Sequence, residues 1–280
     1  TKGTRTDAVF GYALAEPVGQ GTPLTGLAII ERKQNAATVS EVGMPAPPLT
    51  QVGRLFVDVT STGRSVLSIA NPSDQDATVA FFYTDQTGAT TQYATATVKA
   101  REHFSRFISD DPLNIFAPGT LNFTSSIPVV ATSFFTESNE AGELLISHTP
   151  IVDPIAHTVQ VGDKPITIPE FAEGGGWRND IILVNTSESQ MNGEVRFFSQ
   201  GSGDQPGVPT EVGIGDENAP ASVVEFHIPP RTFQKVATAG SATISEVPFT
   251  LNRGTSLSTP NSGPFQISGF ASADSTDPAA

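Results

Sequence analysis

Leu67-Ser-Ile-Ala-Asn71-Pro-Ser73 is an apolar run that ends in an Asn-x-Ser turn. The same sequence motif occurs again as Ile181-Ile-Leu-Val-Asn185-Thr-Ser187. Each copy precedes a stretch with paired phenylalanines, Val79-Ala-Phe81-Phe82 and Val195-Arg-Phe197-Phe198. The asparagines lie 114 residues apart (185 minus 71) and the phenylalanine pairs lie 116 apart (197 minus 81). Because a strand, a turn and a second strand make a hairpin, the phrase predicts a repeat of about a hundred residues, the size of one β-sandwich.

The apolar residues around this phrase recur with period two. Leu55, Val57 and Val59, for example, fall on one side of an extended chain. Such alternation is typical of half-buried antiparallel strands, and Pro and Gly interrupt it at short intervals. The only segment that suits a helix is 110–114, where Pro112 fits the first helical position, and we expect a single turn there. The sequence therefore predicts an all-β fold of tandem antiparallel β-sandwiches.

The repeat is divided unevenly along the chain. The first full copy closes with two apolar stretches, 119–137 and 146–150, and the N-terminal stretch 11–45 resembles that closing half without an opening half before it. The second copy has an opening half but only one recognisable strand after it, at 263–270. The predicted parts are a closing hairpin with a proline-rich linker at 1–50, a complete sandwich at 51–153, a linker at 154–164, and a second sandwich at 165–280 that is incomplete without a donated hairpin.

The composition excludes several classes of protein. The 280 residues include no cysteine, which excludes disulfide scaffolds, thiol catalysis and cysteine zinc sites. A formal net charge of −14 with only 15 Lys and Arg argues against binding to nucleic acid or to anionic membranes. No apolar run approaches the roughly 18 residues that span a bilayer. Little lysine with abundant Ser and Thr is typical of exported proteins, so we expect an extracellular or cell-surface location.

A resemblance to a known family supports the prediction of tandem β-sandwiches in an exported protein. Phe171-Ala-Glu-Gly-Gly-Gly-Trp177, with the apolar run 181–185 after it, resembles the entry phrase of tandem β-sandwich repeat modules in large secreted bacterial surface proteins. Ser40-Glu-Val-Gly-Met-Pro45 is similar to a later piece of the same modules. The chain departs from the pattern at Glu173, where the family phrase has Asp, and after Pro260. The resemblance implies immunoglobulin-like sandwiches in an extracellular setting, and it implies no catalytic residues.

No constellation of residues points to catalysis, and we expect a protein that is not an enzyme and has no cofactor. The histidines, none of which pair at zinc-binding spacing, are His103, His148, His157 and His227. Neighbouring loop carboxylates occur at Asp74/Asp76, Asp110/Asp111 and Asp216/Glu217. Such pairs ordinarily form turns and rarely converge across a cleft as glycosidase chemistry requires. Calcium is the alternative ligand for these oxygens, although no Asp-x-Asp-x-Asp-Gly loop is present.

Trp177 is the single tryptophan, and it stands beside three glycines. A tryptophan in an open position can stack on a sugar ring, so Trp177 is the candidate glycan contact. The alternative is that its ring covers the core at the edge of the sandwich.

The uneven division of the repeat predicts assembly. A sandwich without its closing hairpin exposes strand edges and apolar core, and a hairpin from another copy would cover both by strand addition. Because the donor and acceptor surfaces differ, such contacts generate an open filament. The predicted donor residues are Phe10, Tyr12, Leu14, Leu27 and Ile29, and the predicted acceptor residues are Ile181, Leu183, Val195 and Phe197.

Two functions follow from these patterns. The first is a non-enzymatic structural subunit of an extracellular filament or sheath, which polymerises head to tail by strand complementation and has copies of itself as partners. The second is a secreted adhesin or carbohydrate-binding module with a glycan as its ligand. Neither involves nucleic acid or membrane insertion. Two further alternatives stay open, namely that residues 1–50 close on their own molecule and that the chain is an excerpt of a longer repeat protein.

Overall fold

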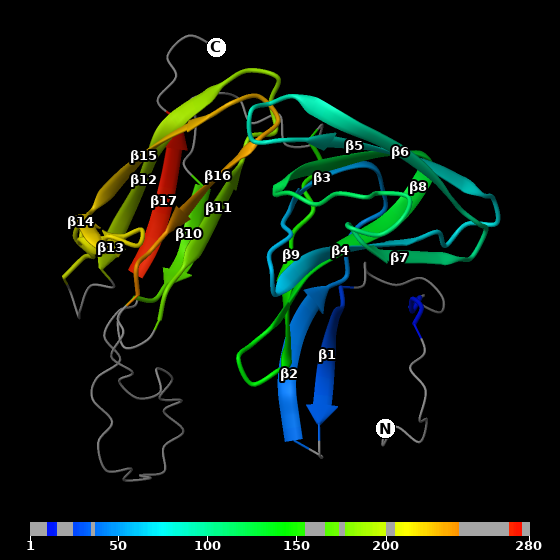
Figure 1. Cartoon of the computed structure of the whole chain (residues 1–280), viewed down its shortest axis with the longest axis horizontal. Helices are drawn as coiled ribbons and strands as arrows, with labels where there is room; N and C mark the ends of the chain where they lie inside the picture. The colour runs from blue at the N-terminus through cyan, green and yellow to red at the C-terminus, as the bar shows by residue number, and fades with distance from the viewer. Residues whose placement is uncertain are drawn as a thin grey trace. The chain divides into compact units, whose positions relative to one another are not determined.

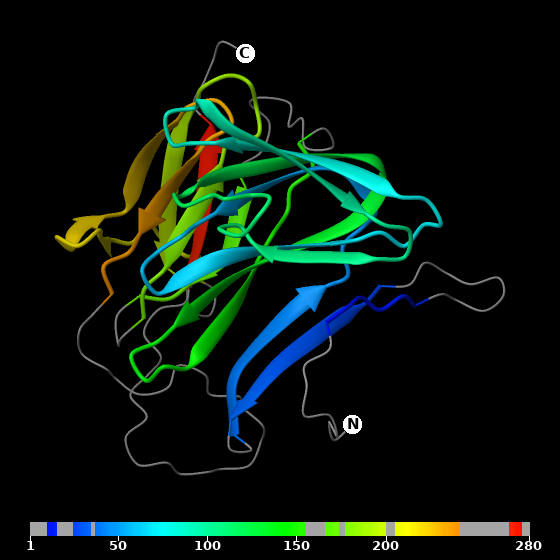
Figure 2. The same cartoon turned by 45° about the vertical axis from the view of Figure 1, so that its right-hand side comes forward.

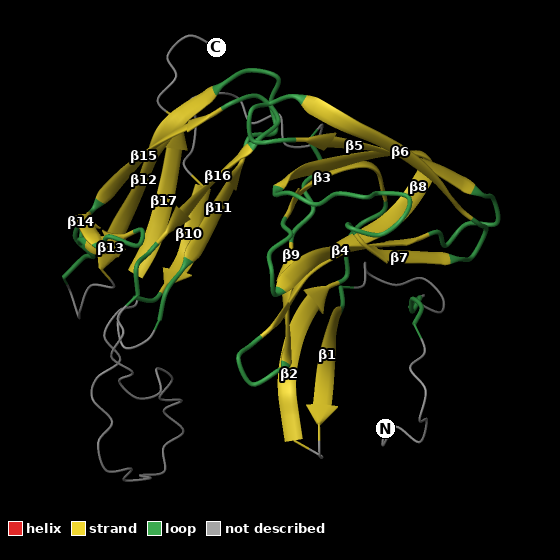
Figure 3. Cartoon of the chain, viewed as in Figure 1, coloured by secondary structure: helices red, strands yellow, loops and turns green. Residues whose placement is uncertain are grey.

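The chain is all-β over the residues that the structure, a computed structural model, describes: 10–15, 25–34, 37–154, 166–173, 177–199, 205–240 and 269–275. These residues contain strands, turns and irregular segments but no helix (Figure 3), which confirms the predicted fold class. Segment 110–114 makes a hydrogen-bonded turn, in which the Leu113 N–H donates to the Asp110 carbonyl at 2.9 Å. Contacts divide the chain into two compact units, which we name unit 1 (Thr1–Thr158) and unit 2 (Val159–Ala280).

Unit 1 is a β-sandwich with an additional hairpin (Figure 1). Its described strands are β1 (Leu27–Gln34), β2 (Ala37–Pro45), β3 (Thr50–Val57), β4 (Gly63–Ala70), β5 (Ala77–Thr84), β6 (Thr90–Val98), β7 (His103–Phe107), β8 (Gly119–Ser138) and β9 (Leu144–Thr149). One sheet has the order β6-β5-β8-β3 and the other has the order β7-β4-β8-β9, all antiparallel. The 20-residue strand β8 therefore belongs to both sheets.

The change of sheet within β8 falls near Pro128. Residues before it pair with β3 and β5, Val129 just after it still lies opposite Thr50 of β3, and residues from Val130 onward pair with β4 and then β9. Proline has no N–H to give to a ladder, so it suits the point at which one ladder stops and the other begins. Between the sheets lie fully buried side chains such as Leu67, Ile69, Phe81 and Phe123.

Unit 2 has a sheet with the same strand order as the first sheet of unit 1. Its described strands are β10 (Ile166–Phe171), β11 (Asp180–Val184), β12 (Met191–Ser199), β13 (Val212–Ile214), β14 (Ala219–Ala221), β15 (Val223–Ile228), β16 (Phe233–Ala237) and β17 (Gly269–Ser275). The order β10-β17-β12-β15 matches β3-β8-β5-β6, and β17, red in Figure 1, lies between β10 and β12. The remaining strands form the pairs β11-β16 and β13-β14.

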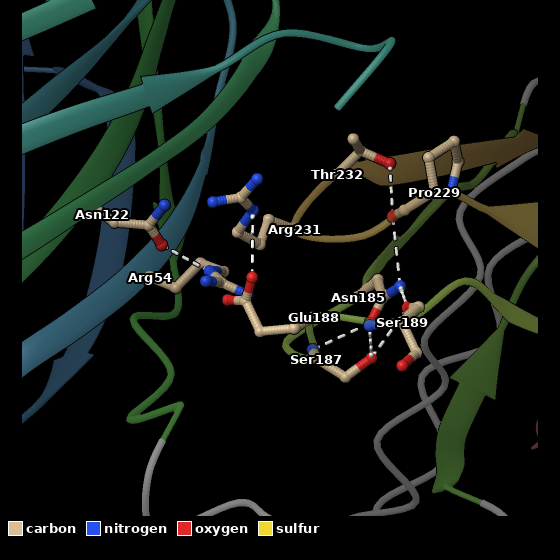
Figure 4. Close-up of polar contacts among 9 residues, drawn as sticks. All are labelled: Arg54, Asn122, Asn185, Ser187, Glu188, Ser189, Pro229, Arg231 and Thr232. Carbon is tan, nitrogen blue, oxygen red and sulfur yellow. Dashed lines mark hydrogen bonds and ion pairs between the residues drawn. The ribbon is translucent and has the colours of Figure 1, made fainter. Parts of the chain in front are cut away.

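The repeated asparagines hold equivalent turns in the two units. Asn71 and Asn185 are both fully buried. The side-chain Nδ2 of each donates to three backbone carbonyls at 2.7, 3.0 and 3.1 Å. For Asn71 these are the carbonyls of Gln75, Val98 and Lys99. For Asn185, which Figure 4 shows, they are the carbonyls of Ser189, Ile228 and Pro229. The hairpin predicted at this turn is not formed, because β4 does not pair with β5 and β11 does not pair with β12. The Asn-x-Ser turn instead joins a strand of one sheet to a strand of the other, and the same amide ties this turn to a later strand in each unit.

A polar pair links β3 and β8 in unit 1. Arg54 is buried and donates from Nε to the side-chain oxygen of Asn122, which is half-buried (Figure 4). The backbone of Arg54 also exchanges two hydrogen bonds of 2.8 Å with Val152, which follows β9. The chain after β9 therefore runs back beside β3 and covers the edge of the first sheet.

Candidate assembly surface

The second sheet of unit 2 has an open edge, by which we mean an edge at which no described strand pairs. β11 pairs along one edge with β16. Its counterpart in unit 1, β4, pairs along both edges, with β7 and with the second half of β8. Over the described residues, the place that β8 and β9 fill in unit 1 has no strand in unit 2.

The backbone of β11 shows which groups face the open edge. The Asn185 N–H donates to the Thr232 carbonyl, and the Thr238 N–H donates to the Asn179 carbonyl, each at 2.9 Å. Residues 179 and 185 therefore point their backbone groups toward β16. Because alternate residues of a strand point these groups to opposite edges, the N–H and carbonyl of Ile182 face the open edge.

The four predicted acceptor residues share one core. Ile181, Leu183, Val195 and Phe197 are all buried in the apolar cluster of unit 2. Ile182, which was not among the predicted acceptor residues, lies on the outer face of β11 and is 37% exposed. Its apolar side chain and its edge-facing backbone make it a residue that a docked strand would contact.

The β1–β2 hairpin is the other half of the candidate surface. β1 pairs only with β2 among the described strands, and Leu27 and Ile29 are 66% and 59% exposed. Figures 1 and 2 show the blue hairpin extending beyond the sandwich strands of unit 1. It is attached through β2, where Ser40 is buried and its Oγ accepts a hydrogen bond from the Ile146 N–H at 3.1 Å. Isolated two-stranded hairpins are marginal in water, so this one gains from a partner.

The strand expected at Phe10, Tyr12 and Leu14 is not formed. Residues 10–15 have no regular secondary structure, and all three side chains are exposed. No described strand offers them a ladder, and an extended segment without one leaves its backbone groups to water. Gly11-Tyr-Ala-Leu-Ala15 also shares its pattern with Gly269-Phe-Ala-Ser-Ala273 of β17, which already holds the position between β10 and β12. Insertion of these three side chains into unit 2 stays a prediction.

Trp177 is 42% exposed and precedes a charged cluster. Arg178 contacts Asp180 at 3.0 Å, and Asp180 also contacts Lys235 at 2.6 Å. Burial alone would raise the pKa of Asp180, but the hydrogen bonds and charges of Lys235 and Arg178 outweigh it and lower that pKa. The ring of Trp177 is accessible to a ligand, and a glycan contact there stays a prediction.

The loop carboxylates with neighbouring cations form separate ion pairs. Asp74 contacts Arg101 at 2.6 Å and Asp76 contacts Lys99 at 2.8 Å, which ties the turn between β4 and β5 to the turn before β7. No group of three or more His, Asp and Glu residues with the geometry of a metal site occurs in the described part of the chain, and His157 lies outside that part. Calcium binding stays a prediction without an assigned site. The described residues also include no helix that could serve as a membrane span.

Comparison with known proteins finds no family model and no curated protein that matches the chain. Among solved structures, the chain is similar to the Anabaena sensory rhodopsin transducer, with 17% identity and a TM-score of 0.28 over 31% of this chain and 97% of that one. It is also similar to Thermotoga maritima 1070, with 10% identity and a TM-score of 0.31 over 36% of this chain and 92% of that one. Likenesses this distant carry no argument about function.

Proposed function

We propose that the protein is a non-enzymatic structural subunit of an extracellular filament or sheath, in which the β1–β2 hairpin of one copy completes unit 2 of the next. One observation supports the proposal most strongly: β11 and β1 each have an edge without a described partner strand. In unit 1 the equivalent edge of β4 is covered by a hairpin that consists of the second half of β8 and β9. The β1–β2 hairpin is thus the same kind of element as the one that the open edge of β11 lacks.

The energetics favour docking over two separate surfaces. Complete burial of an exposed Leu or Ile side chain contributes roughly 1.5–3 kcal/mol. Leu27 and Ile29 are both mostly exposed, and a neighbour at the edge of β11 covers part of this surface, so the contribution of each is smaller than that. The edge of β11 gains main-chain hydrogen bonds, which give strand addition its affinity. The entropy lost when side chains are ordered and two molecules become one complex opposes docking. The net affinity is therefore smaller than the sum of the apolar burial and the hydrogen bonds.

The same geometry determines the form of the assembly. The hairpin lies in unit 1 and the open edge lies in unit 2, so each copy has one donor and one acceptor. Contacts of this heterologous kind extend into open filaments unless the rotation closes a ring. The net charge of −14 keeps filaments apart laterally, so salt and divalent cations, which screen that charge, should promote bundling.

An extracellular or cell-surface location belongs to this proposal. It is supported by the exported type of composition and by the resemblance to modules of secreted bacterial surface proteins. The second candidate function is a secreted adhesin or carbohydrate-binding module, and the exposure of Trp177 favours it. Retention of a monomer on a polysaccharide column, lost in Trp177→Ala, would support that alternative.

The test compares the intact chain with a variant truncated before Gln51, by sedimentation velocity and negative-stain electron microscopy. We expect filaments that lengthen with concentration from the intact chain and none from the truncated one. The truncated chain keeps the acceptor, so adding it to the intact chain should shorten filaments by capping them, which also shows that it is folded. Discrete monomers of the intact chain at all concentrations would contradict the proposal and mean that the open edge is filled within one molecule.

A further inference from the structure

β4 and β11 correspond residue by residue at an offset of 114. After the strands, Asn71 and Asn185 make equivalent hydrogen bonds. Before them, the Asp58 N–H donates to Ser65 Oγ at 2.9 Å, and the Ala172 N–H donates to Asn179 Oδ1 at 3.0 Å. Because the offset is the same at both ends, no residue is inserted between them. Leu67 therefore corresponds to Ile181, and Ser68 to Ile182.

β1 and the second half of β8 correspond at an offset of 105. Each is the first strand of an antiparallel hairpin: Ser133 lies opposite Thr149, just before Pro150, and Ala28 lies opposite Met44, just before Pro45. Their sequences agree in the same alignment. Gly26-Leu-Ala28-Ile-Ile30 and Ala131-Thr-Ser133-Phe-Phe135 both have two small residues at alternate positions and then two large ones.

Combining the two correspondences gives a register. In unit 1, Thr132 of β8 lies opposite Ser68 of β4, and Ser133 lies opposite Leu67. We propose that the donated hairpin enters with β1 antiparallel to β11 and with Leu27 opposite Ile182, Ala28 opposite Ile181 and Glu31 opposite Arg178 of another copy. This inference rests on the proposed function and names the contacts of the same surface.

The register decides which side chains enter the core. In unit 1 the core-facing positions of this part of β8 hold small residues, Ala131 at 4% exposure and Ser133 at 0%. Gly26 and Ala28 take these places, and Leu27 then lies on the outer face beside Ile182. A slip of one residue would turn every side chain over and force Leu27 into a place sized for a small residue, and overpacking of that kind is destabilising.

The register also pairs opposite charges. Glu31 takes the place of Thr136, which lies opposite Arg64 in unit 1, and Arg178 takes the place of Arg64. Among the described residues, each has an ion-pair partner two positions along the chain: Glu31 contacts Lys33 at 2.8 Å, and Arg178 contacts Asp180 at 3.0 Å. Their side chains are 40% and 53% exposed, so both can turn to a partner across the new ladder. Opposite charges directly across a ladder stabilise pairing, and like charges oppose it.

The absence of cysteine from the chain makes the register measurable by disulfide formation. One preparation carries Leu27→Cys, a second carries Ile182→Cys, and the two are mixed under a mild oxidant. Ile182 exposes its N–H to the donor, so the pair has the roughly 5.5 Å Cα separation of hydrogen-bonded partners, which suits a disulfide. The matched control is Ile29→Cys with Ile182→Cys, also on the outer face but diagonal at about 7–8 Å.

We expect the Leu27/Ile182 pair to cross-link on the order of tenfold faster than the control. Docking raises the effective thiol concentration for both pairs, but only the directly opposite pair lies within the Cα separation that a disulfide spans. Equal rates, or a faster control pair, in material that still forms filaments would overturn the register and leave the proposed function standing. Failure of the unsubstituted chain to assemble would instead overturn the proposed function. If a cysteine itself prevents assembly, exchanging charges with Glu31→Arg and Arg178→Glu provides the second test: loss with either change and no recovery with both would overturn the register.

Discussion

Unit 1 and unit 2 have the same strand order in one sheet and differ in the sheet opposite. β3-β8-β5-β6 and β10-β17-β12-β15 are equivalent, and a buried asparagine holds the same turn between the two sheets in both. Unit 1 then closes its second sheet with the end of β8 and with β9, whereas the described part of unit 2 has only β11 and β16 there. Local sequence is therefore enough to build the turn that joins the two sheets, but closing the second sheet depends on a separate hairpin.

The largest expected difference between the units is the effect of proline at equivalent positions. The N–H of Ser68 faces β8, because Asn71 and Ser65 on the same strand face β7. Ser68→Pro therefore breaks an interior ladder and should destabilise unit 1 by about 3 kcal/mol or more. Ile182→Pro removes an N–H at an open edge, where proline is tolerated.

Fluorescence can follow the two units separately, because the only tryptophan, Trp177, lies in unit 2 and the three tyrosines lie in unit 1. Urea denaturation of dilute protein should show Ser68→Pro shifting the tyrosine transition strongly and Ile182→Pro leaving the tryptophan transition within about 1 kcal/mol. A large tryptophan shift in Ile182→Pro would mean that the edge of β11 is already paired in the single molecule.

Replacing the repeated asparagine should destabilise both units by the same amount. Asn71→Ala and Asn185→Ala each remove a buried amide that donates to three carbonyls. Leaving buried carbonyls without a donor costs about 1–3 kcal/mol, and the equal burial of the two asparagines predicts equal losses. The same denaturation curves measure both. A loss confined to one unit would show that the two turns are not equivalent.

A smaller expected difference between the units is in how much stability each loses at low pH. Position 180 holds Asp where the equivalent position 66 of unit 1 holds Val. The folded pKa of Asp180 is lowered, so its stabilising effect is complete above the ordinary value of 3.8 and is lost as the pH falls from there through the lowered pKa. Because the side chain is 37% exposed, solvent screening limits the effect to about 1 kcal/mol or less.

Asp180→Asn should therefore remove part of the acid sensitivity of unit 2 and leave that of unit 1 unchanged. The measurement is the tryptophan transition in urea at about pH 6 and about pH 2.5, on either side of the ordinary pKa of Asp. An unchanged slope with pH in Asp180→Asn would show that its ion pairs with Lys235 and Arg178 contribute nothing measurable.

The smallest expected effect is that of the cross-strand charges. Glu31→Lys should weaken assembly by about 0.2–1 kcal/mol, a few-fold in the dissociation constant, because it places two cations opposite each other. Arg178→Glu in the same chain should restore it. Sedimentation at several concentrations measures both, and a weakening that the second change does not relieve would count against the pairing of Glu31 with Arg178.

Much of the fold follows from sequence. Period-two alternation predicts the strands, and the spacing of Asn71 and Asn185 predicts that the two turns are equivalent. The prediction that each turn closes a hairpin is wrong, because its two strands lie in different sheets. The double role of β8 is not visible, because Pro128 and the polar residues before it suggest two separate strands. The donor face is not visible either. Leu27 and Ile29 are the larger side chains and look core-facing, and only the small, buried Ala131 and Ser133 of unit 1 indicate that the opposite face enters.

Ile182→Pro shows most directly whether another copy docks at the open edge of β11. The intact chain and this variant are compared by sedimentation velocity over a range of concentrations, with the tryptophan transition recorded for each. We expect the intact chain to grow into large assemblies with concentration and Ile182→Pro to stay a folded single copy. Assembly of Ile182→Pro equal to that of the intact chain would contradict it.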